Sequence, residues 1–395
     1  MLRHPSRRVQ KRGDQHIREI VRALPQFDWV NIQLEYGIFG LTSERILRRL
    51  GWILDAAPAV SVAFHTMLDA GELPWREARA ALTRLRPDRA ALLLLGAVRD
   101  QALGWRFYRR LRWTALRKPV RLIAHNRRDA RLLRELHGFR HVFDHPLSFV
   151  SVAEAARIRA TARREDFPII RHLPPEAKLI GTFGFLSAYK GFEVAIRALR
   201  LLPPHYHLLI FGGVHPQTIR RDQLIDPYVR QLLREGRLGQ SLLELLAYEA
   251  PEAVRATRDP SGLFASPPGD LTERVHFMGV LDDDGFARAM AICDAVAMPY
   301  VEVGQTSSGA IALALDMGCR VIASRTKTFL ALNRYFPGEI EFFDIGNHVE
   351  LAQHLAAPPP FERAGRELPF NTTTNAATYV KAHSKQRRLF APSTA

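Results

Sequence analysis

Residues suited to binding a phosphate lie directly after a short apolar segment in the second half of the chain. Residues 178–183 have the apolar content of a buried strand, and residues 192–201 repeat apolar side chains with helical spacing. The loop between them, 184–191, contains Lys190 and a glycine at each end. Backbone amides at a helix N-terminus and a mobile ammonium both favour a bound anion. The loop therefore predicts a phosphate site, with a surface lysine beside a helix start as the alternative.

A second polar loop, 299–309, follows the apolar segment 295–298 and precedes another helical stretch. Its three consecutive hydroxyl side chains are suited to capping that helix, whose amides then point toward a bound ligand. Glu302 is placed to accept hydrogen bonds from sugar hydroxyls. Taken alone, the pattern also fits a well-capped helix with an exposed glutamate. Two such loops at the carboxyl ends of strands in one sheet, however, are where ligands bind in open α/β sheets.

Short apolar strands alternate with helical stretches, which predicts an α/β protein with two parallel, doubly wound sheets. We expect strands at 29–34, 60–64 and 120–124 in the first half, and at 178–183, 206–211, 275–278, 295–298 and 320–324 in the second. A doubly wound domain usually opens with a strand and a glycine-rich turn. The first 28 residues contain instead an arginine-rich, helix-like stretch with one glycine. The first domain is therefore expected to start late or to be a shortened version of a longer one.

A charged, proline-containing segment at 163–176 lacks periodicity and predicts the hinge between two domains. We expect a first Rossmann-like domain over residues 1–172, without its first strand and glycine-rich loop. Residues 173–373 should form a second Rossmann-like domain. The final segment, 374–395, is expected to contain a helix at 379–390.

The order of these motifs resembles that of retaining, nucleotide-sugar-dependent glycosyltransferases with the GT-B fold, a large family that includes bacterial mannosyl- and glucosyltransferases. Residues 178–216 and 273–330 resemble its C-terminal domain, and residues 30–40 and 64–66 resemble parts of its N-terminal domain. The matching residues of the second half are Lys190, Gly191, Phe211, Gly212, Gly213, Val275, His276, Phe277, Met278, Gly279, Asp294, Pro299, Tyr300, Glu302, Ser308, Gly309 and Gly318.

The resemblance implies a cleft between the two domains and a C-terminal segment, 374–395, that packs back on the first domain. It also implies transfer of a sugar from a nucleotide-sugar to a polysaccharide or lipid-linked glycan with retention of configuration. Neither a metal nor a cofactor is expected, because helix dipoles and basic side chains neutralise the leaving diphosphate.

The resemblance also assigns roles to single residues. The catalytic residues would be Glu302, which contacts the transferred sugar, and His65, which has a positioning role near that sugar. His65 is alternatively a hydrogen-bonded histidine at a strand end. Lys190 would hold the donor diphosphate. The acceptor side would be lined by Glu35, Tyr36 and Gly37. The donor side would be formed by Gly184, Lys190, Gly213, His215, Gly279, Val280, Gly304, Gln305, Thr306, Ser307, Ser308 and Gly309.

Two departures from the family pattern weaken the expected donor site. Phe185 stands where many relatives have an arginine beside the loop glycine. Many relatives also have a second glutamate that binds ribose, and here Ala310 or Leu313 occupies its place, according to the register used. A catalytically degenerate partner or scaffold subunit is therefore the alternative function.

The net charge of +16 is confined to the first half of the chain. Residues 1–180 contain 34 lysines and arginines against 18 acidic residues, whereas residues 181–395 contain 22 of each kind. Such asymmetry predicts an anionic partner for the first half. A basic nucleic-acid-binding protein is the weaker alternative function, because no helix-turn-helix, zinc-finger or RNA-recognition pattern accompanies the charge. Nucleic acid is therefore not the expected partner.

The segment 105–118 alternates arginines with large apolar side chains. As a helix it would lie on an anionic membrane, with four side chains at or below the headgroups. These side chains are Trp105, Phe107, Leu111 and Trp113. The alternative is a charged helix whose aromatic side chains pack inward.

The remaining composition favours a cytoplasmic protein, with a peripheral place on the inner face of the cell membrane as a further expectation. No apolar stretch approaches the roughly 20 residues that a membrane span requires, and the first residues do not resemble a secretory signal. The two cysteines, Cys293 and Cys319, lie in apolar runs and are expected to be free thiols.

Overall fold

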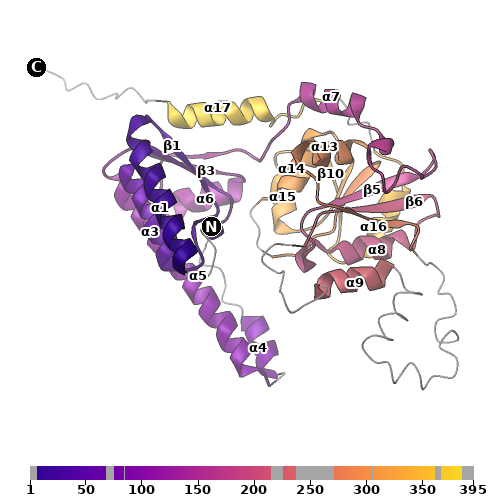
Figure 1. Cartoon of the computed structure of the whole chain (residues 1–395), viewed down its shortest axis with the longest axis horizontal. Helices are drawn as coiled ribbons and strands as arrows, with labels where there is room; N and C mark the ends of the chain where they lie inside the picture. Colours follow the sequence, from indigo (N-terminus) through magenta and orange to yellow (C-terminus); the bar gives the residue numbers. More distant parts are fainter. Residues whose placement is uncertain are drawn as a thin grey trace, which may run out of the picture. The chain divides into compact units, whose positions relative to one another are not determined.

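The computed structural model describes residues 7–67, 75–83, 85–214, 226–236, 271–303, 307–360 and 366–384. The chain forms two compact units (Figure 1). The first unit contains residues 1–146 and 374–395, and the second contains residues 147–373. The sequence places the boundary after residue 172 instead. The structure places it after Pro146, because Ile158 and Phe167 are buried in the core of the second unit.

A four-stranded parallel sheet forms the centre of the first unit, with its strands in sequential order. These strands are β1 (Val30–Leu34), β2 (Val60–Phe64), β3 (Val120–Ala124) and β4 (Val142–Asp144). The first three agree with the predicted strands, whereas β4 has three residues and too short an apolar pattern to be recognised. The helices are α1 (Arg7–Ala23), α2 (Tyr36–Phe39), α3 (Ser43–Ala56), α4 (Trp75–Thr83), α5 (Pro87–Ala115), α6 (Arg127–Glu135) and α17 (Thr372–His383).

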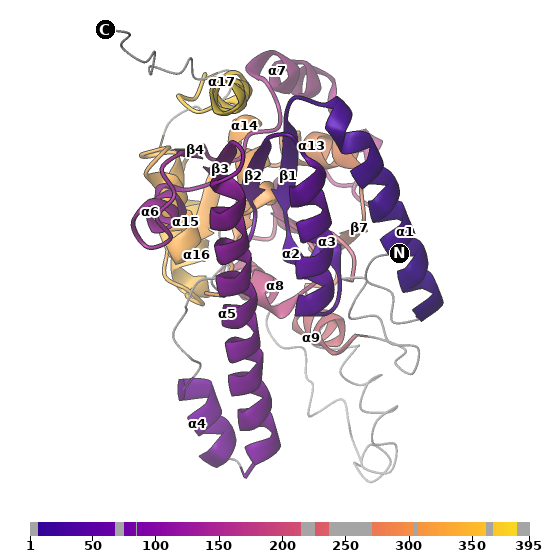
Figure 2. The same ribbon diagram turned by 90° about the vertical axis from the view of Figure 1, so that its left-hand side faces the viewer.

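Alternate strand residues pack on the two faces of this first sheet. Leu34, Val62 and Leu122 lie in a core with the inner faces of α3 and α5, and Figure 2 shows these two helices across one face of the sheet. On the other face, Ala63 and Ile123 pack with Ala382 of α17, which begins seven residues before the predicted start at 379. Residues 385–390 of the predicted helix lie outside the described residues.

The second unit contains a six-stranded parallel sheet with the strand order β10-β9-β8-β5-β6-β7. The strands are β5 (Lys178–Phe183), β6 (Tyr206–Phe211), β7 (Val275–Gly279), β8 (Ala295–Met298), β9 (Val321–Ser324) and β10 (Ile340–Phe343). The first five confirm the predicted strands. From β5 the chain builds the sheet first to one side and then, from β8, to the other, so the order reverses between β5 and β8.

Helices cover both faces of this second sheet (Figure 1). Ile180 and Leu208 face α8 (Phe192–Leu199) and α16 (His348–Ala356), whereas Leu179 and Leu209 face the opposite set of helices. Burial on both faces explains why these strands have almost continuous apolar sequences. The remaining helices are α7 (Val152–Thr161), α9 (Pro227–Gly236), α13 (Asp283–Ala291), α14 (Gly309–Asp316) and α15 (Lys327–Asn333).

The start of the second unit is held by Asp316, the last residue of α14. Its carboxylate accepts hydrogen bonds from the backbone amides of Phe149 and Val150, at 2.5 and 3.1 Å, and from the hydroxyl of Ser148 at 3.0 Å. Burial nevertheless raises the pKa of Asp316 to about 6. The folded state therefore favours the protonated carboxyl group relative to the unfolded chain.

This raised pKa predicts a pH-dependent stability. The contribution of Asp316 to the free energy of unfolding is complete below about pH 4 and is lost as the pH rises to about 6. We expect the difference in unfolding free energy between wild type and Asp316→Asn to change by about 2 kcal/mol across this interval. Urea denaturation at several pH values measures it. Asp282→Asn, at the exposed N-cap of α13, is the control, and an equal change in that variant would contradict the prediction.

Candidate functional site

The two predicted loops of the second unit lie next to each other where the strand order reverses. The β5 loop begins at Gly184, whose amide donates to the carbonyl of Phe211 at 3.0 Å. Further along the chain, the amide of Val301 donates to the carbonyl of Tyr189 at 2.9 Å, which joins the loop after β8 to the loop after β5. The reversal point of an open parallel sheet is the usual place for a ligand.

Two glycines allow the loop after β5 to approach the loops after β8 and β6 closely. Gly191 has a φ of +64°, and a Cβ atom there would lie 2.0 Å from the carbonyl oxygen of Pro299. Gly212 has a φ of +145°, and its Cβ would lie 1.8 Å from the carbonyl oxygen of Gly184. Both contacts are with backbone atoms, so no side-chain movement relieves them. Only glycine fits at these positions.

Lys190 is buried in the centre of this site, with 6% of its surface exposed. Its ammonium donates to the hydroxyl of Tyr300 and lies 3.9 Å from the centre of that ring and 5.1 Å from the centre of the Tyr189 ring. In the described part of the chain, no carboxylate lies within ion-pair distance of Lys190. Burial lowers the pKa of Lys190 below its ordinary value. The side chain also lies back over Gly184, where a Cβ would be 2.9 Å from its Cε.

The helix α14 begins beside this ammonium. Ser308 occupies the N-cap position, but its hydroxyl makes no capping hydrogen bond with α14. It lies 3.3 Å from the hydroxyl of Tyr300, the same group that binds Lys190. The predicted capping by Ser308 is therefore wrong, because this hydroxyl is drawn into the contact with Tyr300. The first amides of α14 are left to face the loop.

Glu302 is exposed after the end of β8. One of its carboxylate oxygens accepts a hydrogen bond of 2.7 Å from the backbone amide of Lys327, at the start of α15. A carboxylate at a helix N-terminus is stabilised by the helix dipole. This contact gives Glu302 a defined position on the same edge of the sheet as Lys190.

Some of the other predicted donor residues lie in the described part of the chain, and four lie outside it. Gly213 and Val280 are in contact, because a Cβ on Gly213 would lie 2.5 Å from Cγ2 of Val280. Gly279 ends β7 with a φ of +77°, and Ser307 and Gly309 flank the start of α14. The predicted residues outside the described part of the chain are His215, Gly304, Gln305 and Thr306.

The two departures from the family pattern are visible in the structure. Phe185 is half exposed at the rim of the β5 loop, where it adds apolar surface and no charge. Ala310 and Leu313 pack against the core of the second unit as part of α14. At neither position does this chain supply a polar group for a ribose.

Polar side chains also gather where the strands of the first sheet end. His65 follows β2, and its Nε2 lies 2.6 Å from the side-chain oxygen of Gln33. Glu35 follows β1 and accepts a 2.5 Å hydrogen bond from the hydroxyl of Thr66. Burial lowers the pKa of His65, with partial compensation by the charge of Glu35. The side chain of Tyr36 is buried against Phe107 and belongs to the core.

His125, at the end of β3, is a feature of this edge to which sequence reasoning assigned no role. It is buried, its ring lies 4.7 Å from that of His65, and its Nδ1 lies 3.2 Å from the carbonyl oxygen of His145. A carbonyl only accepts, so Nδ1 carries the proton and Nε2 is an acceptor. That Nε2 has no partner among the described residues, and burial lowers the pKa of His125 to about 4. The position of His125 directly after a predicted strand is the sequence feature that indicates a role at this edge.

Comparison with solved structures identifies the fold. The sucrose-phosphate synthase of Thermosynechococcus elongatus aligns with 96% of this chain and 79% of its own, at 16% identity and a TM-score of 0.57. The UDP-forming trehalose-phosphate synthase of Burkholderia xenovorans aligns with 96% and 79%, at 12% identity and a TM-score of 0.54. The two units have the GT-B fold. A Rickettsia africae glycosyltransferase also aligns, with coverages of 96% and 78%, 13% identity and a TM-score of 0.50.

No protein-family model and no curated sequence matches the chain. The GT-B fold thus rests on the arrangement of the elements and not on sequence identity. Within the GT-B fold, the Lys190 site belongs to the C-terminal Rossmann-like unit and the His65 edge to the N-terminal one. Among the described residues, no group of three or more His, Cys, Asp and Glu side chains is arranged to hold a metal.

Proposed function

We propose that the protein is a glycosyltransferase whose second unit binds a nucleotide-sugar donor. The observation that carries the proposal is the buried ammonium of Lys190, which has an aromatic ring and a hydroxyl as neighbours. Taking a cation out of water is costly unless an anion compensates it. The diphosphate of a nucleotide-sugar supplies that anion at the reversal point of the sheet.

The geometry supports a role for the chain's own groups in stabilising the leaving diphosphate. The ammonium of Lys190 and the first amides of α14 present positive charge to one small region beside Tyr300. Charge that builds up on the departing oxygens would be neutralised by these groups without a metal. Glu302 would contact hydroxyls of the transferred sugar. The motif order supports transfer with retention of configuration.

We propose that the polar edge of the first sheet binds the acceptor, a polysaccharide or lipid-linked glycan. Two partly exposed groups support this role, namely the carboxylate of Glu35 and the ring of His65. His125 is buried beside His65, and its low pKa keeps its imidazole neutral at pH 7. For this reaction we propose a location in the cytoplasm.

A binding measurement tests the donor proposal directly. Nucleoside diphosphates should raise the melting temperature of the full chain, and the nucleotide with the largest effect identifies the base. Release of that diphosphate from its sugar nucleotides then tests transfer. If no nucleoside diphosphate stabilises the protein, the donor proposal is refuted. The second candidate, a degenerate partner subunit, is favoured by the apolar Phe185 and Ala310, and is supported if nucleotides bind without any transfer.

We further propose that the first unit docks on a membrane surface. The hairpin formed by α4 and the first half of α5 extends beyond the sheet (Figure 2), and its leucines at 82, 85, 92 and 95 are exposed, Leu85 to 88%. Exposed arginines, among them Arg79, Arg86 and Arg89, lie on the same hairpin. Apolar side chains flanked by arginines suit the surface of an anionic bilayer. No helix in the described part of the chain combines the length and apolarity of a membrane span.

The orientation of α5 about its own axis decides which of the four side chains predicted to contact a membrane are exposed. Phe107 and Leu111 are fully buried in the core of the first unit, so they are unavailable to lipid. Trp105 and Trp113 are on the outer side and are 56% and 43% exposed. Of the four side chains expected at the headgroups, two therefore pack inward.

We expect the protein to float with vesicles that contain phosphatidylglycerol and not with vesicles of phosphatidylcholine alone. Leu92→Asn with Leu95→Asn should reduce flotation about tenfold, because two exposed leucines lose their insertion into the bilayer. Leu330→Asn and Val349→Asn, at exposed positions in the second unit, are the matched control. Equal flotation with both vesicle types would refute electrostatic docking.

A further inference from the structure

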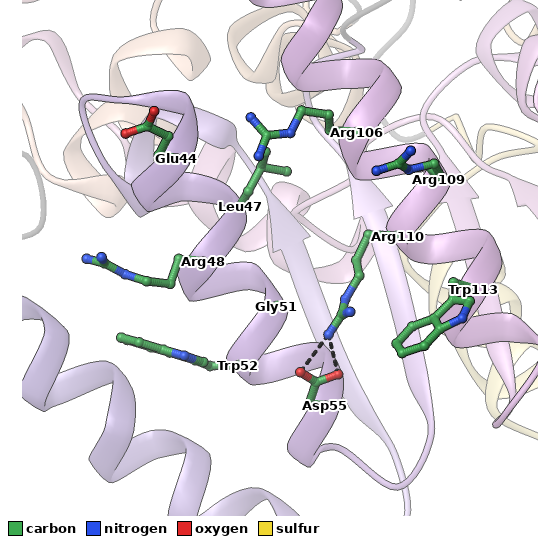
Figure 3. A pocket seen from close by; sticks show the side chains of 10 residues that line it. All are labelled: Glu44, Leu47, Arg48, Gly51, Trp52, Asp55, Arg106, Arg109, Arg110 and Trp113. Atoms are coloured by element: carbon green, nitrogen blue, oxygen red, sulfur yellow. Dashed lines mark hydrogen bonds and ion pairs between the residues drawn. The ribbon is translucent and has the colours of Figure 1, made fainter.

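A cavity of about 670 Å³ lies between α3 and α5 in the first unit (Figure 3). Leu50 and Leu54 of α3 and Phe107 and Leu111 of α5 face the sheet. The cavity is therefore on the opposite side of these two helices, away from the core. None of the residues proposed above for the donor or the acceptor lines it.

The cavity is lined by more positive than negative charge. Four arginines and two carboxylates, those of Glu44 and Asp55, contribute to its wall. Two of the arginines already have carboxylate partners. Arg48 binds Asp14 at 3.1 Å, and Arg110 binds Asp55 at 2.5 Å (Figure 3). The other two are Arg106 and Arg109, and in the described part of the chain no carboxylate lies within ion-pair distance of either. Their guanidinium groups remain available to an anion.

Guanidinium groups in and beside the cavity lie over tryptophan rings. The ring centre of Trp52 of α3 lies 5.1 Å from the guanidinium of Arg18 and 5.5 Å from that of Arg48. Trp113 of α5 has the corresponding contacts with Arg110 at 4.9 Å and with Arg117 at 3.2 Å. A guanidinium beside an indole face keeps its N–H groups free for a ligand.

Arg109 is held in the same manner by Trp105, with its guanidinium 4.6 Å from the ring centre. This contact fixes one of the two arginines that lack a carboxylate. Less side-chain entropy is lost on binding when a charged group is already held in place.

We infer that this cavity binds a phosphate ester, with the phosphate on Arg106 and Arg109 and the organic part against Leu47 and the edges of the Trp52 and Trp113 rings. The forked guanidinium donors match phosphate oxygens. The cavity is much larger than a phosphate group, which leaves room for the organic part beside the indoles. The ligand is either a phospholipid headgroup or a soluble phosphate ester. This site is separate from the donor site and does not rest on the proposed function.

Tryptophan fluorescence of the full chain tests the inference. All five tryptophans belong to the first unit, so binding at the donor site in the second unit adds little to the signal. Glycerol 3-phosphate is one probe, and vesicles of phosphatidylglycerol with phosphatidylcholine are the other. We expect a saturable change with at least one probe. Saturation by glycerol 3-phosphate indicates a soluble ligand. Saturation by the vesicles alone indicates a lipid headgroup if Gly51→Leu, which fills the cavity and leaves the α4–α5 hairpin intact, abolishes it.

Arg106→Gln with Arg109→Gln should weaken this binding about tenfold, because two charge-assisted contacts are lost. The matched control is Arg112→Gln with Arg128→Gln, which removes the same charge at exposed positions of the first unit outside the cavity and should change binding less than about twofold. Equal weakening by both pairs would show a diffuse charge effect and would overturn the inference. Binding of an oligonucleotide through Arg106 and Arg109, with neither probe bound, would also overturn it.

A second variant separates binding from folding. Gly51 lines the cavity within α3, and a Cβ there would meet no atom within 4 Å. Gly51→Leu should fill the space and abolish binding while the melting temperature stays equal or rises, because leucine favours a helix more than glycine does. Unchanged binding by this folded variant would place the ligand elsewhere and refute the inference.

Discussion

Gly191→Ala is expected to lower the free energy of unfolding of the second unit by about 3 kcal/mol or more. A residue with a side chain at a φ of +64° is strained, at a cost of about 1 kcal/mol. The larger part arises because the new Cβ would lie 2.0 Å from the carbonyl oxygen of Pro299. One of the two loops then has to move, and the hydrogen bond from Val301 to Tyr189 connects those same loops.

Denaturant unfolding and nucleotide-induced thermal shifts together measure this effect. Gly338→Ala is the matched control, because Gly338 also has a positive φ, of +81°, but a Cβ there would meet no atom within 4 Å. It should cost only about 1 kcal/mol and leave nucleotide binding unchanged. If the two variants prove equally stable, the close approach of the loops is not a feature of the protein.

Lys190→Met is expected to weaken binding of the donor diphosphate about a hundredfold while stabilising the free protein by about 1 kcal/mol. The ammonium is buried against Tyr300 and Tyr189, and methionine fills a similar volume without a charge. A buried charge without a counter-ion destabilises the folded state, but the same charge is what attracts the diphosphate. The two effects of the substitution therefore have opposite signs.

The pH dependence of stability provides a second test of Lys190. Burial lowers the pKa of this lysine, so its cost to the folded state is complete below the lowered pKa. That cost decreases as the pH rises from the lowered pKa toward the ordinary lysine range. The stabilisation by Lys190→Met should therefore be largest at neutral pH and decrease under alkaline conditions.

Lys178→Met is the control for Lys190→Met, because Lys178 is exposed at the start of β5 and pairs with Asp294. It should leave the thermal shift by nucleotides unchanged. Thermal shift and isothermal titration with the best nucleoside diphosphate distinguish the two variants. A Lys190→Met protein that binds the nucleotide as tightly as wild type would remove the main support for the donor site.

Buried strands were the easiest elements to predict. The apolar runs at 178–183 and 206–211 are nearly continuous because helices cover both faces of the second sheet. Short strands such as Val142–Asp144 are too brief for any periodicity. The sequence does not predict the full length of α5, because its leucine-rich first half is exposed and lacks the polar face of an ordinary surface helix.

The sequence predicts that Lys190 and Glu302 follow the ends of strands. The burial of Lys190 and the hydrogen bond of Glu302, however, depend on contacts between distant segments. Lys190 is buried because Tyr300, 110 residues away, covers it. Glu302 is fixed by the amide of Lys327, the first residue of a helix that was not predicted. The sequence resemblance includes His125 as a polar position without a role, and only the fold places its ring beside that of His65.

The sequence alone determined the α/β class, the two polar loops after strands and the excess of arginine in the first half, because composition and short-range periodicity encode these properties. Tertiary structure alone decided which side of α5 faces outward. A helix with apolar and charged residues on several sides takes its rotation from its packing partners, here α3 and the first sheet. That packing buries Phe107 and brings Arg106 and Arg109 to a cavity lined also by Arg48 and Trp52, more than fifty residues earlier in the chain.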